Sequence, residues 1–293
     1  MNPASLRPFP VSVVTMGPGS QPGENGDDAP EYLSMPRGME TFSAPRLPEN
    51  VSPAALAEAA RLLAAFVGRA DAAGFSGDAV LDLLPLDRAV REVITQSLGF
   101  GEVSAFTTAP QQWRVQESAF AGFWRVLEMA ADGRCLSDTL QTGAIPACLI
   151  AAMRATAADS LPLPDYPPGT MNAPALAEEI RQQAAVFYAG QPAHVINLTL
   201  LPVSEADLDT LYHWLGHREV SILSRGYGNC RITSTRLKNA WWVQYFNSMD
   251  TLILNSLEIV DMPDVALASS EDFDDSLARL REYLDMMAET GTD

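Results

Sequence analysis

The sequence predicts an α+β fold made by tandem duplication of a small α+β domain, and two observations lead to it. First, residues 81–150 align without a gap on residues 198–267, a displacement of 117 positions that gives 15 identities in 70 positions. A period this long indicates two copies of a domain rather than a solenoid. Second, helical and strand-like segments with hairpin-like pairs do not alternate as regular strand–helix–strand units, which favours an α+β layer structure in each copy.

We expect the chain to divide into four regions. Residues 1–50 are an extended Pro- and Gly-rich arm, because prolines at this density disfavour helix. Residues 51–160 form the first repeat, residues 161–170 a Pro-rich linker, and residues 171–293 the second repeat with its acidic C-terminal helix. The arm also carries many apolar residues, so we expect it to dock on a groove of its own or a neighbouring protomer.

Apolar spacing and turn residues predict the elements of each repeat. In the first repeat they are helices at about 53–70 and 87–98, a short apolar run at 78–84, and strand-like segments at 102–107 and 112–127. In the second they are a helix at about 174–189, a strand at 194–201, a helix from Ser204 to Leu215, a strand at 219–224, hairpin strands at 231–237 and 240–246, and a helix at about 270–288. Residues 251–260 fit helix or strand. Trp124 and Trp241 are equivalent and expected in the core.

Composition excludes several classes of function. A net charge of −18 argues against a nucleic-acid backbone or an anionic membrane as partner. No apolar run reaches membrane-span length, and the N-terminus lacks signal-peptide features, so we expect a cytoplasmic protein. Cys135, Cys148 and Cys230 are scattered and do not form a disulfide framework. His213 and His217 lie four residues apart, but no motif completes a metal site, so we expect neither metal nor cofactor.

The sharpest difference between the copies is Ser224–Cys230, which replaces Thr107–Trp113 of the first repeat. Two glycines flank Tyr227 and allow a tight turn that exposes its ring. The alternative is that this is a simple hairpin turn with a core cysteine. Our candidate partner-binding residues are Arg225, Gly226, Tyr227, Gly228, Asn229, Cys230, Arg231 and Trp242.

Two of these candidates carry specific expectations. We expect Arg225, Arg231, Arg236 and Lys238 to cluster around this loop and to lower the pKa of the Cys230 thiol, since nearby cations stabilise a thiolate. Trp242 should lie on the opposite strand face from Trp241. It could then be an exposed interface residue or be buried under the C-terminal helix or the N-terminal arm.

Residues 224–262, SRGYGNCRITSTRLKNAWWVQYFNSMDTLILNSLEIVDM, resemble the C-terminal signature of the HupH/HyaF/HoxQ-type accessory proteins of membrane-bound NiFe-hydrogenase operons. The Phe9-Pro10, Gly17–Ser20 and Tyr32–Met39 segments of the arm resemble theirs too. The resemblance implies a cytoplasmic maturation chaperone for the iron–sulfur small subunit, which acts before twin-arginine export together with a thioredoxin-like accessory protein. It transfers no catalytic residues.

The leading hypothesis is therefore a non-catalytic chaperone or scaffold. One alternative is a transient iron–sulfur carrier, although a protein-bound cluster normally needs about four ligands. Another is a thiol enzyme that uses Cys230 as nucleophile and a nearby histidine as base.

Overall fold

The computed structural model describes residues 45, 51–76, 79–226 and 228–290. All of them belong to one compact unit, residues 39–293. The expected N-terminal arm lies outside the described residues apart from Pro45, and so does Tyr227. Among the described residues, no helix is both long and apolar enough to cross a bilayer.

The order of elements is the same in the two repeats up to the last strand of each; after it the first repeat has one helix, and the second has a short turn and a long helix. The first repeat contains α1 (Pro53–Ala73), β1 (Val80–Asp82), α2 (Arg88–Leu98), β2 (Val103–Thr107), β3 (Gln112–Glu117), β4 (Phe123–Met129), β5 (Cys135–Thr142) and α3 (Ala147–Thr156). The second contains α4 (Ala173–Val186), β6 (His194–Asn197), α5 (Glu205–Leu215), β7 (Val220–Ser224), β8 (Asn229–Ser234), β9 (Ala240–Phe246), β10 (Leu252–Ile259), the short 3₁₀ turn η1 (Asp264–Ala266) and α6 (Ser270–Thr290). Helices combined with an antiparallel sheet confirm the α+β class.

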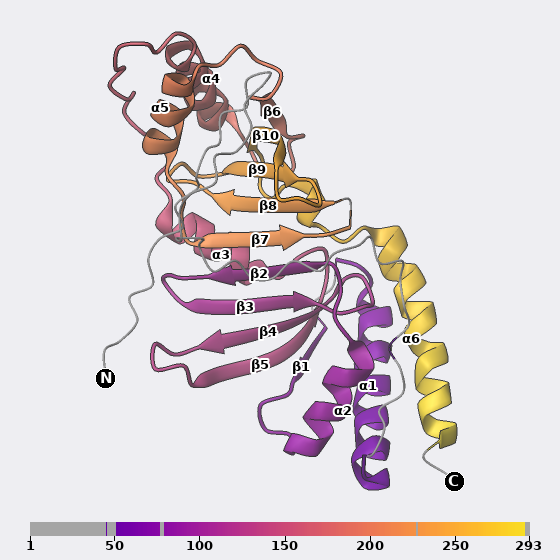
Figure 1. Cartoon of the computed structure of the whole chain (residues 1–293). Coiled ribbons are helices and arrows are strands. Elements are labelled where there is room, and N and C mark those ends of the chain that lie inside the picture. Colours follow the sequence, from indigo (N-terminus) through magenta and orange to yellow (C-terminus); the bar gives the residue numbers. More distant parts are fainter. Residues whose placement is uncertain (1–44, 46–50, 77–78, 227, 291–293) are drawn as a thin grey trace. The chain divides into compact units, whose positions relative to one another are not determined.

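The two repeats share one antiparallel sheet of ten strands. Its strand order is β1-β5-β4-β3-β2-β7-β8-β9-β10-β6, so the second half mirrors the first about the β2–β7 junction (Figure 1). Across that junction Val103 pairs with Ser224, Ala105 with Ile222, and Thr107 with Val220. Ala105 and Ile222 are 117 positions apart (222 − 105). An approximate two-fold axis therefore passes between them and relates the repeats.

One part of the sequence alignment is wrong. The gapless register placed Leu81–Pro85 on Leu198–Pro202. In the sheet, the amide of Leu83 donates to the carbonyl of Asp138 (2.8 Å), and the amide of Leu198 donates to that of Asn255 (2.9 Å). Asp138 and Asn255 are counterparts, so Leu83 corresponds to Leu198, an offset of 115 (198 − 83). The second repeat carries two extra residues between β6 and α5, and a two-residue slip leaves the side-chain alternation intact.

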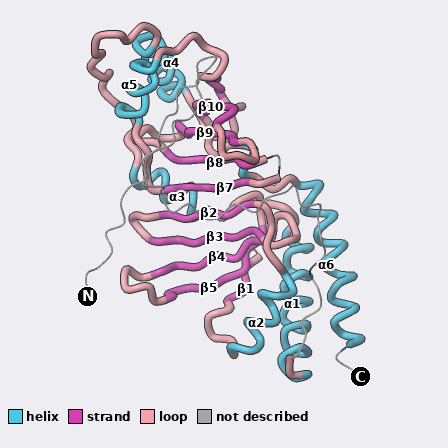
Figure 2. The backbone as a smooth tube through the Cα atoms, in the orientation of Figure 1, coloured by secondary structure: helices cyan, strands magenta, loops and turns pink. Residues whose placement is uncertain are grey.

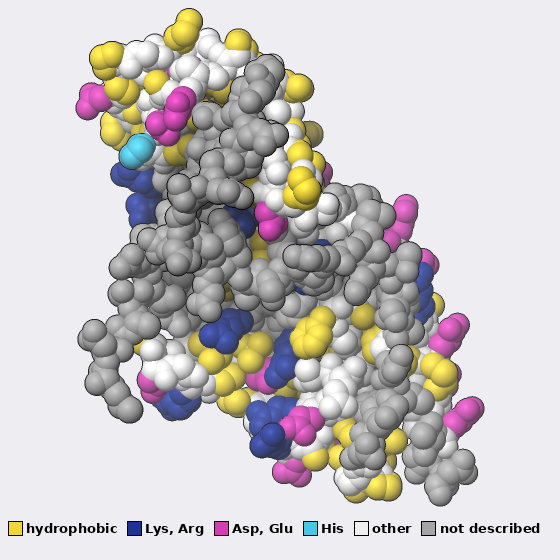
Figure 3. All heavy atoms as spheres, viewed as in Figure 1, with side chains coloured by type: hydrophobic (Ala, Val, Ile, Leu, Met, Phe, Trp, Pro, Cys, Tyr) yellow, Lys and Arg dark blue, Asp and Glu magenta, His cyan; other side chains and the backbone are white. Residues whose placement is uncertain are grey.

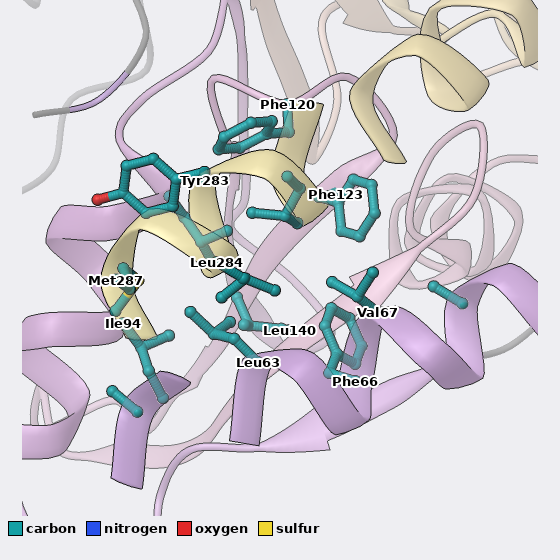
Figure 4. Close-up of a cluster of buried hydrophobic side chains, with 14 of the residues drawn as sticks. Leu63, Phe66, Val67, Ile94, Phe120, Phe123, Leu140, Tyr283, Leu284 and Met287 are labelled. Carbon is teal, nitrogen blue, oxygen red and sulfur yellow. The ribbon is translucent and has the colours of Figure 1, made fainter. Parts of the chain in front are cut away.

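Helices cover the sheet in separate groups (Figure 2). On one face, α1, α2 and α6 pack on the outer strands of the first repeat, where Phe66, Phe123, Leu140 and Met287 belong to one buried cluster (Figure 4). On the same face, α4 and α5 cover the outer strands of the second repeat. On the opposite face, α3 and the segment around η1 cover a central core to which both repeats contribute.

The C-terminal helix crosses over to the first repeat. Phe273 of α6 stacks on Phe123 with ring centroids 5.3 Å apart, and Arg281 pairs with Asp71 of α1 at 2.6 Å. The segment that follows α3 crosses the other way, since the amide of Lys238 donates to the carbonyl of Ala158. Each repeat is thus completed by a segment of the other.

Several predicted elements needed correction. The segment 112–127 is two strands separated by a turn, and the ambiguous segment 251–260 is the strand β10. The predicted strand 194–201 ends at Asn197, where the chain turns before α5. Strand β5 and helix α3 were not predicted.

Candidate functional site

The loop between β7 and β8 contains two glycines for two different reasons. Gly228 has φ of +103°, a conformation that disfavours residues with a side chain. Gly226 has no such φ, but a Cβ there would overlap the carboxylate of Glu102, 3.2 Å from its Cδ. Arg225, Gly226, Gly228 and Asn229 are all half-buried. Gly228 is therefore required by its own backbone conformation, and Gly226 leaves room for a side chain of the first repeat.

Cys230 is a core residue. It is 2% exposed and belongs to the central core shared by the repeats. Burial raises the pKa of its thiol to about 12, although the Tyr245 side-chain hydrogen bond acts in the opposite direction. The expectation of a lowered pKa is wrong, because burial removes the hydration that a thiolate needs.

The four cations expected to cluster around the loop do not gather there. Arg231 follows Cys230 on β8 and points to the opposite face of the sheet, where its guanidinium carbon lies 5.0 Å from the centre of the Phe246 ring. Arg236 and Lys238 lie beyond the other end of β8, and Lys238 pairs with Asp159 at 2.6 Å. Only Arg225 remains at the loop itself.

Trp242 lies on the opposite strand face from Trp241, as predicted, but it is fully buried. Its ring stacks on that of Tyr212 of α5, with centroids 4.3 Å apart, and its indole N–H donates to the carbonyl of Gly216 (3.3 Å). Its counterpart Arg125 instead forms an ion pair with Asp138 (2.8 Å). The interpretation of Trp242 as an exposed interface residue is wrong, because α5 covers it. The expected cover by the C-terminal helix is also wrong, since α6 packs on the first repeat.

The histidines do not form a metal pair. The Nδ1 atom of His213 contacts the carbonyl of Asp209 at 2.7 Å, whereas the ring of His217 stacks on Tyr212. Within the described part of the chain, no three His, Cys, Asp or Glu side chains are grouped as the ligands of a metal ion would be.

The structure reveals one candidate surface that the sequence interpretation missed. Large apolar side chains are exposed at the end of the β9–β10 hairpin and on the adjacent β6–α5 connection. The most exposed are Leu200 (80%), Met249 (79%) and Ile253 (56%). A hydrogen bond from the amide of Asn255 to the hydroxyl of Thr199 (2.8 Å) holds the two segments side by side. We call this surface the apolar tip; it comprises Leu200, Leu201, Met249, Leu252 and Ile253.

Clusters of exposed apolar side chains of this kind mark interaction surfaces. Three of its residues, Met249, Leu252 and Ile253, lie within the QYFNSMDTLILN stretch that carried the family resemblance. The sequence does contain a sign of this surface: Met249 lies in a polar turn, and three consecutive apolar residues follow at 252–254. A strand with one face in solvent would alternate apolar and polar residues instead.

Comparisons with known proteins cover nearly the whole chain. The family model described as "HupH hydrogenase expression protein, C-terminal conserved region" matches twice, over residues 53–162 and 170–287. These two matches coincide with the two repeats and support the duplication.

Three relatives show how far the similarity extends. The hydrogenase expression/formation protein HoxQ of Cupriavidus necator is 43% identical over 281 residues, which is 95% of this chain and 98% of the relative. HupH of Rhodobacter capsulatus is 42% identical over 278 residues, 94% and 98% of the two chains. The hydrogenase-1 operon protein HyaF of Escherichia coli is 36% identical over 213 residues, 71% and 73% of the two chains. The chain therefore belongs to the HupH hydrogenase expression protein family.

Proposed function

We propose that this protein is a non-catalytic accessory protein of hydrogenase maturation, acting as a chaperone or scaffold. Its client is the iron–sulfur small subunit of an uptake NiFe-hydrogenase, bound in the cytoplasm before twin-arginine export with the help of a thioredoxin-like accessory protein. Its relatives are named hydrogenase expression/formation proteins, and these names support a role in hydrogenase maturation. The structural observation that carries a partner-binding role is the apolar tip.

The apolar tip suits a client-binding role because its side chains stay exposed when the chain folds. Their burial would therefore contribute free energy to the binding of a partner. Burying a large aliphatic side chain contributes about 1.5–3 kcal/mol. Leu200 and Met249 leave most of that contribution unused in the folded chain. The counterpart of Ile253 in the first repeat, Leu136, is also exposed, but the counterpart of Met249 is Asp132. The full apolar cluster is a feature of the second repeat alone.

The loop residues Arg225, Gly226, Tyr227, Gly228 and Asn229 form our second proposed contact with the client. Among these, the described residues sit on a backbone held by neighbouring strands, so a partner would meet a preformed surface. Arg231 borders this surface on the other sheet face. Cys230 and Trp242 would support it from below through packing.

The burial of Cys230 argues against the two alternative functions, the thiol enzyme and the iron–sulfur carrier. A nucleophile or an iron ligand must be a thiolate, and a buried thiol with a pKa of about 12 is protonated at neutral pH. The thiol enzyme and the cluster carrier both depended on this residue.

Charge favours a basic segment of the client. The net charge is −18, and acidic side chains are spaced along the exposed side of α6 (Figure 3). These are Glu271, Asp272, Asp274, Asp275, Glu282, Asp285 and Glu289. The basic start of a twin-arginine signal peptide would be attracted to such a surface, an effect that raises association rate more than affinity.

The test is a binding titration of the full chain with the small-subunit precursor, with and without its signal peptide. The tip variant Met249→Ser/Ile253→Ser should weaken binding by about tenfold or more, since exposed apolar anchors carry much of an interface's energy. Leu136→Ser at the counterpart position is the matched control and should bind like the wild type.

A second pair of variants tests the loop. Arg225→Ala/Asn229→Ala should weaken binding, whereas Thr108→Ala/Gln112→Ala at the counterpart positions should not. Wild-type affinity in both the tip and the loop variants would refute the proposed client surface.

A further inference from the structure

The loop of the second repeat is held by a residue of the first repeat. Strand β7 pairs with β2 until Ser224 faces Val103. One residue further, the amide of Arg225 donates to the carbonyl of Glu102 at 3.2 Å. Glu102 immediately precedes β2, so the chain of the first repeat follows the loop beyond the last strand pair.

The side chain of Glu102 also shapes the loop. Its carboxylate lies in the space that a side chain at Gly226 would occupy, with the Cδ atom 3.2 Å and the Oε1 atom 3.8 Å from an ideal Cβ position. Gly226 and Glu102 are therefore mutually dependent, since the carboxylate can lie against the loop backbone only when residue 226 has no side chain.

The approximate two-fold axis provides a second example of the same contact. Glu219 is the counterpart of Glu102 (219 − 102 = 117), and Thr108 is the counterpart of Arg225. The carbonyl of Glu219 accepts a hydrogen bond from the amide of Thr108 at 3.1 Å, and its carboxylate accepts one from the Thr108 hydroxyl. Each end of the β2–β7 junction thus has a glutamate that holds the hairpin loop of the other repeat.

The two ends differ in how the carboxylate acts. At the first-repeat loop, Glu219 meets a hydroxyl and forms a side-chain hydrogen bond. At the second-repeat loop, Glu102 meets a glycine and fills the space beside its backbone. Because the carboxylate is the far end of a flexible side chain, a side chain at residue 226 would displace it from this position.

We propose that Glu102 is a positioning residue for Arg225 and Gly226, so that the partner-binding surface of the second repeat is built jointly by both repeats. The positioning itself is independent of any partner. Its consequence for client binding rests on the proposed function, and the experiment separates the two.

Hydrogen exchange of the full chain, followed by mass spectrometry, tests the positioning. Glu102→Ala should raise exchange in peptides covering residues 224–229 by about tenfold, because local opening there becomes easier. Glu102→Gln, which keeps the volume, should restore slow exchange. Glu219→Ala is the matched control and should accelerate exchange around Thr108 but not around Gly226. Wild-type exchange at 224–229 in Glu102→Ala would overturn the proposal.

A double-mutant cycle provides the second measurement. Gly226→Ala should accelerate exchange of the loop in the wild-type background, because the new Cβ displaces the carboxylate. In the Glu102→Ala background the same substitution should have much less effect, so the two changes are coupled. Additive effects would overturn the proposal.

Client binding by the same variants tests the link to function. Weaker binding by Glu102→Ala, with Glu219→Ala unchanged, supports the joint surface. If the loop opens in Glu102→Ala while client affinity stays at the wild-type value, the positioning role stands and the loop's part in the proposed function fails.

Discussion

Ala105 and Ile222 face each other across the β2–β7 junction, and each is the counterpart of the other in the duplicated sequence. Both are buried in the central core, which also contains Trp124 of the first repeat and Trp241 of the second. A sheet that continues through this pair has no free edge between the repeats. The two repeats therefore share one continuous sheet and its central core.

We expect the two repeats to unfold in one cooperative transition. Ile222→Ala should lower the free energy of unfolding by about 2–4 kcal/mol, the cost of a cavity at a fully buried aliphatic residue. Urea unfolding followed by tryptophan fluorescence measures the overall stability, and hydrogen exchange reports on each repeat separately. Both repeats should lose stability together. Ile253→Ala on the exposed tip is the control, with an expected change within about 0.5 kcal/mol. Two separated transitions would contradict a shared core.

The sequence was informative wherever local pattern decides structure. Trp124 and Trp241 are buried at equivalent positions, as the alignment predicted. Gly99 ends α2 with φ of +61°, and Ser204 begins α5 with a capping box. These features depend on a few neighbouring residues. The alternation of Trp241 and Trp242 between the sheet faces was predictable for the same reason.

Features that depend on distant packing could not be predicted. The burial of Trp242 requires α5, and that of Cys230 requires the joining of both repeats into one core. Helix α3 was missed because its residues pack against both repeats and show no clear polar face in the sequence. The two-residue slip near Leu83 was hidden by the chance match of LDLLP with LTLLP. The contact of Glu102 with Gly226 joins residues 124 positions apart (226 − 102) and leaves no local signal.

Cys230 should be chemically inert in the folded protein. With a thiol pKa of about 12, only about one molecule in 10⁴ carries a thiolate at pH 8. In the variant Cys135→Ser/Cys148→Ser, an aromatic disulfide reagent should react with the remaining thiol only after denaturant is added. Cys230→Ala should keep its client affinity. Rapid modification of the native variant would restore the thiol-based hypotheses.

Asp207 joins the starts of two helices. Its Oδ1 atom accepts hydrogen bonds from the amides of Met171, Asn172 and Ala173, each at 2.8 Å, and its Oδ2 atom accepts from the Ser204 amide at 2.9 Å and from the Ser204 hydroxyl. Burial by itself would raise the pKa of this carboxyl, but the hydrogen bonds outweigh it and lower the pKa to about 2. The carboxylate form therefore stabilises the fold.

We predict that Asp207→Ala lowers the free energy of unfolding by about 2–4 kcal/mol at pH 7, since it removes a helix cap and leaves buried amides without an acceptor. A pKa that is lower in the folded state contributes stability above about pH 4, and this contribution is lost as pH falls towards 2. The difference between wild type and variant should therefore shrink in acid. Asp209→Ala, on the exposed side of α5, is the control. An equal difference at pH 7 and pH 2.5 would contradict the assignment.

Glu117 is a buried carboxyl group. It is 7% exposed, and its Oε1 atom accepts a hydrogen bond from the Gly122 amide at 3.3 Å. Burial raises its pKa to about 7; hydrogen bonds from the backbone of Gly122 and Val103 lower it, and the charges of Glu102 and Asp272 raise it further. Its counterpart in the second repeat is Ser234, whose neutral hydroxyl accepts from the amide of Val220 (3.1 Å).

We predict that Glu117→Gln makes the protein more stable at pH 8 by roughly 1–3 kcal/mol and changes stability little at pH 5. The sign follows from the raised pKa. The folded state binds this proton more tightly than the unfolded state, so wild-type stability declines as pH rises from about 4.5 to about 7 and stays low above that. Glutamine keeps an acceptor for the Gly122 amide and carries no charge at any pH, so the decline should disappear. Urea unfolding of the wild type and the variant at pH 5, 6, 7 and 8 measures this decline, with the exposed Glu282→Gln as control. A variant that loses stability equally at every pH would mean that Glu117 is ionised in the folded protein.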